Sequence, residues 1–217
     1  MSSAAGSATD SPRDQVRRAM RMRRRDLTDK QYAQAARDLA RVVSRQGWLR
    51  PGRRIAIYLP FRRELDTRIV MRMALQCRCR LYVPLVTNLH THRMEFVRLN
   101  PGERLRRNRL GIHEPPRHAA ERIPVRELDL ILLPLLAVDE RGWRLGSGAG
   151  FYDRRLNHLR AGRRWRKPRL IGVAYEFQRV PRLEPAPWDV PLDAVVTERA
   201  LYVIPSHSLP GIDRGFS

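Results

Sequence analysis

The amino-acid sequence predicts one α/β domain, in which helices cover both faces of a mixed β-sheet. Short, nearly continuous apolar runs indicate strands buried on both faces, and segments with helical periodicity alternate with them along the chain. The 217 residues suffice for one large core. We expect the domain to span residues 11–205, with a disordered N-terminal tail over residues 1–10 and a C-terminal tail over residues 206–217 that could also be disordered.

Two helices are expected before the first strand. Ser11 can cap the first of them, and Pro12 suits the first helical position. Thr28 and Gln31 form a capping box at the start of the second helix, whose apolar residues recur at helical spacing until Gly47. One face of this second helix should therefore be buried.

The rest of the chain is expected to build the sheet. Four apolar runs indicate buried strands, an amphipathic segment indicates a crossover helix between the first two, and one segment alternates apolar and polar residues. The strands are expected at residues 55–59, 81–83, 130–133 and 170–174, the crossover helix at 67–76, the alternating strand at 94–99, and a hairpin at 135–145. A sheet that combines crossovers with hairpins is mixed, and here it should be mostly parallel.

The composition excludes a membrane-spanning protein, because 30% of the residues are charged and no apolar run reaches the roughly 18 residues that a spanning helix needs. The first ten residues lack the basic and apolar regions of a secretory signal, so we expect a cytoplasmic protein. Cys77 and Cys79 are too close in the chain for an easy disulfide, and we interpret both as reduced thiols. The six histidines show no spacing typical of a metal cage or a catalytic triad.

The net charge of +21 predicts an anionic partner, which could be a nucleic acid, a membrane surface or a small polyanion such as a nucleotide. All but two of the 43 basic residues are arginines, and they occur in every segment rather than in one tail. Such a spread is more typical of a compositional bias of the genome than of a nucleic-acid footprint. We therefore do not expect nucleic acid to be the main partner.

The most informative segment is the glycine-rich run RLGSGAGFYDR at residues 144–154, which lies between a strand of the expected hairpin and a helix expected from about residue 151 to 159. Three glycines at alternate positions would let backbone N–H groups approach a phosphate, although the spacing is neither that of a Walker A loop nor that of a dinucleotide fingerprint. A tight turn without a ligand is the alternative. Asp153 could pair with the helix dipole or reach a magnesium ion on the phosphates.

Other charged side chains could belong to the same site. Arg13 and Arg17 are four residues apart, hence on one face of the first helix, where they could clamp a phosphate or face solvent. Glu64 follows the first strand at the carboxyl edge of the sheet, where open α/β folds bind ligands. Asp189 and Asp193 lie in a loop before another strand, and either could meet the aspartate of the glycine-rich run.

These segments together resemble the 5-formyltetrahydrofolate cyclo-ligase family, also called 5,10-methenyltetrahydrofolate synthetases. Several ordered blocks carry the resemblance over about residues 11–204, and the glycine-rich run is highly specific. The blocks are the basic start with Arg13 and Arg17, YLP at 58–60 followed by ELDT at 64–67, GIHEP at 111–115, the run at 144–154, IGVA at 171–174 with Gln178, and residues 188–197.

The resemblance implies a single three-layer α/β/α domain of the Rossmann-like type. It also implies an ATP- and Mg²⁺-dependent ligase of one-carbon metabolism, which cyclises 5-formyltetrahydrofolate to 5,10-methenyltetrahydrofolate and releases ADP and phosphate. In the family's scheme the formyl oxygen attacks the γ-phosphate, and N10 of the folate then displaces phosphate from the activated carbon. Arginines, backbone amides and a metal ion suit such a reaction. We expect a monomer that acts on these small molecules.

The resemblance also implies roles for residues of this chain. Asp153 and Asp189 would bind magnesium, and Tyr152 and Arg154 would be catalytic. The folate would contact Leu59, Glu64, Ser147, Gly148, Ala149, Gly150 and Phe151, with Glu64 accepting hydrogen bonds from the pterin. ATP would bind to Arg13, Asp14, Gln15, Val16, Arg17, Arg144, Leu145, Gly146, Ser147, Gly148, Ala149, Gly150, Phe151 and Tyr152.

Three positions depart from the family pattern. Leu135 and Val138 stand where many members have a glycine and an aromatic residue, which leaves the shape of the folate pocket open, and Phe151 stands in place of a tyrosine. An alternative function is that of a catalytically silent relative that binds RNA through its basic surface. A third, a sugar-phosphate enzyme on a similar scaffold, would rest on fold similarity alone.

Overall fold

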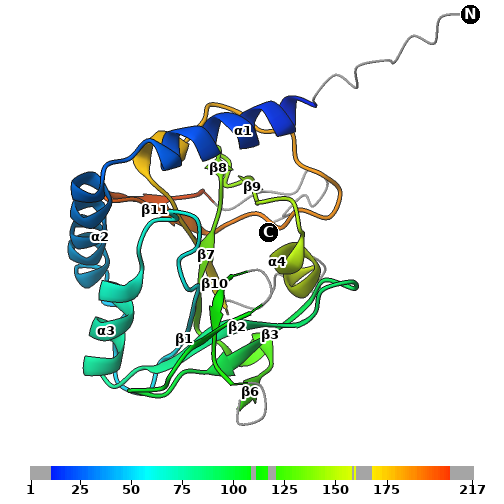
Figure 1. The fold of residues 1–217 in the computed structure, drawn as a ribbon. Coiled ribbons are helices and arrows are strands. Elements are labelled where there is room, and N and C mark those ends of the chain that lie inside the picture. The colour runs from blue at the N-terminus through cyan, green and yellow to red at the C-terminus, as the bar shows by residue number, and fades with distance from the viewer. Residues whose placement is uncertain (1–10, 109–110, 117–120, 158, 160–167, 206–217) are drawn as a thin grey trace, which may run out of the picture.

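An eight-stranded mixed sheet forms the centre of the computed structural model (Figure 1), which describes residues 11–108, 111–116, 121–157, 159 and 168–205. The strand order is β12-β11-β10-β7-β1-β2-β3-β6. The five neighbours from β11 to β2 run parallel, whereas β3, β6 and β12 are antiparallel to the strands beside them. The expected mixed, mostly parallel sheet is thus confirmed. The expected tails, 1–10 and 206–217, lie outside the described residues.

The expected strands and the crossover helix are present with bounds within two residues of those expected, except that β2 extends to Asn88. The strands of the sheet are β1 (Arg54–Ile57), β2 (Arg80–Asn88), β3 (Arg93–Arg98), β6 (Arg122–Ile123), β7 (Leu130–Pro134), β10 (Arg169–Val173), β11 (Ala194–Val196) and β12 (Leu201–Val203). Two short antiparallel pairs accompany it, β4 (Arg106–Arg107) with β5 (His113–Glu114), and the expected hairpin of β8 (Ala137–Val138) with β9 (Arg144–Leu145). The α-helices are α1 (Pro12–Arg25), α2 (Asp29–Ser44), α3 (Arg68–Gln76) and α4 (Phe151–Leu156), and 3₁₀ turns occur at Val125–Glu127 and Glu176–Gln178.

The first three helices begin where their capping residues predict. Ser11 precedes α1 and accepts a hydrogen bond from a backbone N–H of its first turn at 3.2 Å. Thr28 and Gln31 form the expected capping box of α2, with contacts of 3.2 and 2.8 Å. Asp66 accepts from the first backbone N–H of α3 at 2.9 Å, so its side chain serves the start of that helix.

The helix expected from about residue 151 to 159 is shorter in the described structure. It begins at Phe151, as expected, and α4 is described as far as Leu156. Within the rest of the expected helix, residue 158 lies outside the described part of the chain.

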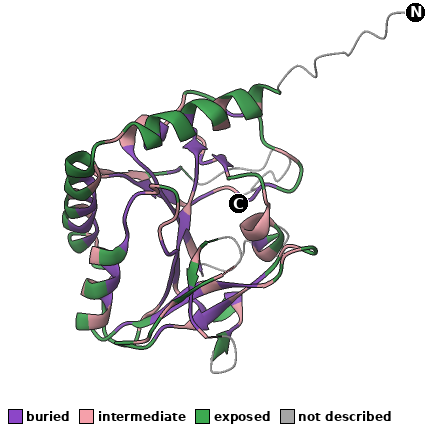
Figure 2. Cartoon of the chain, viewed as in Figure 1, coloured by how far each residue is buried: buried purple, intermediate pink, exposed green. Residues whose placement is uncertain are grey.

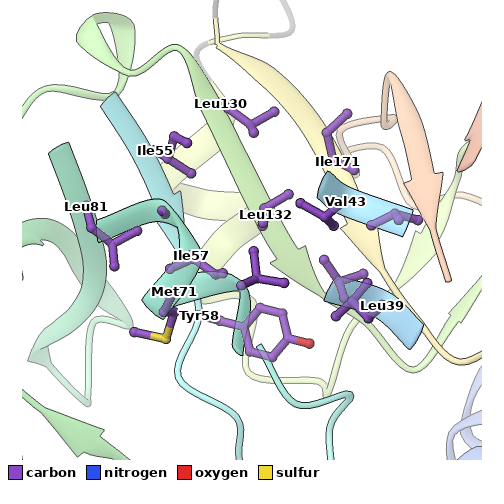
Figure 3. Packing of buried hydrophobic residues seen from close by; sticks show 14 of the residues in the cluster. Leu39, Val43, Ile55, Ile57, Tyr58, Met71, Leu81, Leu130, Leu132 and Ile171 are labelled. Carbon is purple, nitrogen blue, oxygen red and sulfur yellow. The ribbon is translucent and has the colours of Figure 1, made fainter. Parts of the chain in front are cut away.

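Helices cover both faces of the sheet, which gives the expected three layers (Figure 1). On one face, α2 and α3 pack on the strands through a buried cluster that includes Leu39, Val43 and Met71 (Figure 3). On the other face, Leu156 of α4 packs with alternate strand residues such as Ile131. The strands are mostly buried while the outer sides of the helices are exposed (Figure 2), as a sheet covered on both faces requires.

Helix α1 lies apart from this layering, across one end of the sheet and above the β8–β9 hairpin (Figure 1). Two of its residues, Met20 and Arg24, are buried, whereas α2 buries five. Met20 packs with apolar residues of the hairpin region. Since α1 buries so little apolar surface, polar contacts at this end of the sheet must do much to hold it.

Two further expectations bear on the class of protein. Within the described part of the chain, no helix combines the length and apolarity needed to cross a bilayer. Cys77 is exposed, Cys79 is buried, and both are free thiols.

Leu135 and Val138, the two hairpin residues that depart from the family pattern, are buried in the core against the second face of the sheet. Any effect of these two side chains on a substrate pocket would therefore act through core packing.

Candidate functional site

Arginines on one face of α1 hold the glycine-rich loop between β9 and α4. The Arg17 Nε donates to the carbonyl of Gly146 at 3.2 Å, and the Arg21 Nη2 donates to the carbonyl of Ser147 at 2.8 Å. Residues 17 and 21 are one helical turn apart, so both guanidinium groups reach the same side of the loop. The structure thus brings Arg17 next to the segment with which it was expected to share a site.

Arg13, one turn earlier, contacts a different segment. Its Nη1 and Nη2 both lie 3.1 Å from Oδ2 of Asp189, and Nη1 also donates to the carbonyl of Glu184 at 2.9 Å. Asp189 is buried, and the same Oδ2 accepts from the backbone N–H of Ala186 at 2.8 Å. Arg13 therefore fixes the Asp189 carboxylate beside the first turns of α1.

The glycine-rich loop leaves open space beside its backbone. Gly148 and Gly150 have φ angles of 108° and 67°, which favour glycine because it lacks a Cβ. A Cβ added at Gly146 or Gly148 would meet no protein atom within 4 Å. Neither of these two glycines is therefore needed to avoid a clash within the protein, and the loop has room for a ligand to approach its amides.

Arg144 connects this loop to the segment that carries Asp189. Its side chain is almost fully buried, its Nη2 donates to Oδ1 of Asp153, and its Nη1 donates to the carbonyl of Val190 at 2.7 Å. Through this one guanidinium group, Asp153 in the first turn of α4 lies close to the residue that follows Asp189. Arg144 thus links the segments that carry the two aspartates expected to bind magnesium.

The donor set at this point suits magnesium held jointly with phosphates. Mg²⁺ prefers oxygen ligands and is usually bound by one or two carboxylates, waters and substrate phosphates. Among the described residues, no group of three or more His, Cys, Asp or Glu could hold a metal without such help. Asp193 does not join the site, because its carboxylate accepts from the N–H of Leu170 near the amino end of β10. Asp153 and Asp189 are the carboxylates expected to bind it, and each pairs with an arginine in this structure, Asp153 with Arg144 and Asp189 with Arg13.

Glu64 lies past the carboxyl end of β1, near the C-terminal end of α1, where Arg24 is. Its Oε2 accepts from the backbone N–H of Phe61 at 3.1 Å, and Oε1 lies 3.9 Å from Nη2 of Arg24. The side chain is 18% exposed, and its burial raises the pKa of Glu64 to about 7, against the opposing effects of Arg24 and Phe61. Leu59, the other expected folate contact, is buried in the core beside β1.

Tyr152 joins the two parts of the site. Desolvation and the nearby Glu64 carboxylate raise the pKa of its hydroxyl far above the ordinary value, while Arg144 acts in the opposite direction. Tyr152 thus stays protonated and lies within the electrostatic reach of both groups. Arg154, two residues further along α4, donates to the carbonyl of Ala149 in the loop at 3.3 Å.

Sequence reasoning missed three residues near the site. Arg24 and Arg21 were hidden in a helix that is basic on several sides, although residues 13, 17, 21 and 24 share one helical face. His92, for which the sequence showed no metal or triad spacing, packs against Phe151 with the two rings tilted and their centroids 5.3 Å apart. It lies in the turn between β2 and β3, and no sequence signal placed that turn beside α4.

Comparison with known proteins gives one consistent family. Residues 9–198 match the 5-formyltetrahydrofolate cyclo-ligase family. The chain is 34% identical over 180 residues to the 5-formyltetrahydrofolate cyclo-ligase of Escherichia coli K12, which covers 82% of this chain and 96% of that protein. The corresponding protein of Mycolicibacterium smegmatis is 30% identical over 161 residues, 71% of this chain and 80% of that protein.

Solved structures show the same fold. The 5,10-methenyltetrahydrofolate synthetase of Aquifex aeolicus superimposes with a TM-score of 0.74 at 27% identity, over 91% of this chain and 95% of that one. The synthetase of Mycoplasma pneumoniae superimposes with a TM-score of 0.68 at 20% identity, over 87% and 99% of the two chains, and at that identity supports the fold alone.

Proposed function

Because this chain belongs to the 5-formyltetrahydrofolate cyclo-ligase family, we propose that it closes 5-formyltetrahydrofolate into 5,10-methenyltetrahydrofolate at the expense of ATP, with Mg²⁺, and through a phosphorylated formyl group. That the chain is an enzyme, and a folate cyclo-ligase, follows from the family itself. The nucleotide, the metal and the intermediate are the parts that we propose.

One observation carries the proposal: the cationic face of α1 lies against the glycine-rich loop, which leads into Asp153. Tyr152, at the start of α4, is close enough to Glu64 for the Glu64 carboxylate to help raise the pKa of the Tyr152 hydroxyl. A polyanion and a planar, hydrogen-bonding heterocycle could thus be bound side by side. ATP needs the first kind of surroundings and the pterin of a folate needs the second. The 5-formyl group would then lie where the two halves of the site meet.

In the proposed binding mode, the ATP phosphates lie along α1 and the glycine loop. Arg17 would turn from the carbonyl of Gly146 to the phosphate oxygens, because a guanidinium prefers a charged acceptor to a carbonyl. Arg13 would exchange the Asp189 carboxylate for phosphate oxygens when that carboxylate binds the metal. The other ATP contacts would be Asp14, Gln15, Val16 and the segment from Arg144 to Tyr152. Asp153 and Asp189 would hold Mg²⁺, which supplies charge neutralisation on the phosphates.

The folate would lie on the other side of the loop. Glu64 would accept hydrogen bonds from the pterin, Leu59 would line the pocket, and residues 147–151 would border both substrates. The formyl oxygen would attack the γ-phosphorus as the bond to ADP breaks. N10 would then attack the formyl carbon, lose its proton and expel phosphate. Arg154 and the neutral Tyr152 hydroxyl, both beside the loop, would stabilise charge on the transferred group.

The direct test is the ultraviolet absorbance of the methenyl product. Purified protein is mixed with 5-formyltetrahydrofolate and Mg²⁺-ATP, with matched reactions that omit ATP, omit Mg²⁺ with a chelator present, or replace ATP with a non-hydrolysable analogue. We expect an absorbance rise in the complete mixture alone, and one ADP for each methenyl group formed. A rise without ATP would overturn the proposed phosphoryl step. The cytoplasmic location and the monomeric state remain predictions from the sequence.

A further inference from the structure

The turn that carries Glu64 is held in a costly backbone conformation. The backbone N–H of Glu64 donates to the carbonyl of Phe61 at 3.0 Å, which closes a four-residue turn. Its two central residues, Arg62 and Arg63, have φ angles of 47° and 56°. Left-handed φ at a residue other than glycine costs on the order of 1 kcal/mol, and here two arginines in succession adopt it. Such a turn persists only where its surroundings determine it.

Buried side chains determine this turn through its carbonyl groups. Nη2 of Arg24 donates to the carbonyl of Phe61 at 3.2 Å and to that of Arg62 at 2.8 Å. The hydroxyl of Tyr175 donates to the carbonyl of Arg63 at 3.2 Å. Just beyond the turn, the hydroxyl of Tyr58 donates to the carbonyl of Leu65 at 2.6 Å.

Arg24 is the unusual member of this set. Its side chain is 6% exposed, and burying a guanidinium costs several kcal/mol unless its hydrogen bonds and charge are compensated. Its Nε is buried without a hydrogen-bond partner, so the compensation is incomplete. Arg24 of α1 lies 3.9 Å from Glu64, and the Glu64 carboxylate also helps to raise the pKa of the hydroxyls of Tyr58, after β1, and Tyr152, in α4. An apolar residue would fill the same space at less cost, which indicates a role beyond packing.

We propose that Arg24 is a positioning residue for the folate substrate: it holds the Phe61–Glu64 turn through two backbone carbonyls and so presents the Glu64 carboxylate to the pterin. The inference rests on the proposed role of Glu64. It adds a residue of α1 to the folate half of the site, whereas Arg13 and Arg17 of the same helix belong to the ATP half. Arg24 itself need not touch either substrate.

The test compares three variants of the full chain. Arg24→Met removes the donors and the charge but keeps much of the side-chain length, and Arg24→Lys keeps a charge and a donor. Arg25→Met is the matched control, because Arg25 is an exposed arginine of the same helical turn. For each variant we would measure KM for both substrates, kcat, the Kd of 5-formyltetrahydrofolate by calorimetry without ATP, and thermal unfolding.

We expect Arg24→Met to raise the folate KM and Kd at least tenfold and to leave the KM for ATP within twofold. Arg24→Lys should raise the folate values two- to fivefold, and Arg25→Met should match the wild type. Should Arg24→Met not fold, the lysine variant alone decides. Folate values within experimental error of the wild type in a folded variant, or equal rises in both KM values, would overturn the proposal.

Glu64→Gln separates this inference from the function on which it rests. A normal folate KM in Glu64→Gln would remove the proposed role of Glu64, and the inference with it. A raised KM in Glu64→Gln with a normal KM in Arg24→Met would overturn only the inference. If Arg24 acts through Glu64, the double variant should lose little more folate affinity than Glu64→Gln alone. Fully multiplicative losses would show that Arg24 acts by another route.

Discussion

The buried guanidinium of Arg144 binds the carboxylate of Asp153 on one side and the carbonyl of Val190 on the other. It thereby joins the first turn of α4 to the loop that carries Asp189, two segments that no helical or strand spacing relates. This link holds the carboxylate of Asp153 and the segment that carries Asp189, whose own carboxylate pairs with Arg13.

Asp153→Asn should weaken the use of Mg²⁺-ATP while the domain stays folded. The amide oxygen of asparagine can still accept from Arg144, so the link to α4 survives, but the charge that attracts the metal is lost. We expect kcat/KM for Mg²⁺-ATP to fall by roughly ten- to a hundredfold, as is common when a metal site is disturbed, with half-saturation at higher magnesium. Rates measured across magnesium concentrations check this.

Asp38→Asn is the control for that experiment, because Asp38 pairs with Arg41 on the outer side of α2. It should leave the magnesium dependence unchanged. An Asp153→Asn enzyme with the wild-type rate at limiting magnesium would show that Asp153 does not bind the metal.

Two glycines should respond in opposite ways to alanine. A Cβ at Gly146 would meet no protein atom within 4 Å, so Gly146→Ala should change the free energy of unfolding by less than about 0.5 kcal/mol. A Cβ at Gly172 would lie 2.6 Å from Leu192 and 2.7 Å from Leu135, both buried, so Gly172→Ala should cost about 1–3 kcal/mol. Gly146→Ala should instead raise the KM for ATP about tenfold, since its methyl group enters the space proposed for phosphate.

Urea unfolding and ATP kinetics on the two alanine variants test this pair. A normal KM for ATP in Gly146→Ala would show that the nucleotide does not approach the loop at that residue. A fully stable Gly172→Ala would show that the two leucines repack without cost.

Glu64→Gln should remove a loss of folding stability that the wild type undergoes as pH rises. Because the pKa of Glu64 is about 7 in the folded protein and ordinarily 4.5, the unfolded chain loses this proton first as pH rises. The wild type is thus destabilised, relative to the variant, as pH rises from about 4.5 through 7, by up to about 3 kcal/mol for this shift of the pKa. Urea unfolding of both proteins between pH 4.5 and 8 measures the difference. A difference that stays constant over this range would contradict the raised pKa.

Ionic strength should separate the proposed enzyme from an RNA-binding protein. A nucleotide held by a few arginines in a pocket should lose less than about tenfold in affinity between 50 and 200 mM salt, whereas a polyanion held by six or more phosphate contacts loses about a thousandfold or more. ATP KM values and RNA titrations over the same salt series make the comparison. Tight RNA binding that collapses with salt, without cyclo-ligase activity, would favour the RNA-binding alternative.

Most helices and strands were predictable because the signals that define them lie within a few residues of one another in the sequence. The cap at Ser11 and the capping box at Thr28 and Gln31 depend on near neighbours, and both are present in the structure. The buried strands followed from apolar runs that need no knowledge of their partners. The order of the strands in the sheet, by contrast, follows from long-range packing, and the sequence predicted only that the sheet would be mixed and mostly parallel.

The candidate site was predictable where its residues lie in one motif. The glycine-rich run and Asp153 stood out by their spacing, but Arg24 did not, since its burial depends on a turn about forty residues away along the chain. That turn also lacks a sequence signal. Positions with a left-handed backbone conformation are usually occupied by glycine or asparagine, and here they are occupied by Arg62 and Arg63. Only tertiary hydrogen bonds to the carbonyls explain why the chain accepts them.

The way in which α1 is attached has a consequence for local opening. This helix buries two residues, Met20 and Arg24, and is held largely by its guanidinium groups. Arg13 pairs with the Asp189 carboxylate, and backbone carbonyls accept from Arg13, Arg17, Arg21, Arg23 and Arg24. Because α1 buries so little apolar surface, the free energy of its local unfolding should be low. The backbone amide hydrogens of α1 should therefore exchange with solvent before those of α2. Each opening would release the arginines proposed for ATP and the clamp on the Glu64 turn at once. Ligands that bind only the form with α1 docked on the sheet oppose this opening by mass action. Bound substrates would therefore stabilise the docked position of α1.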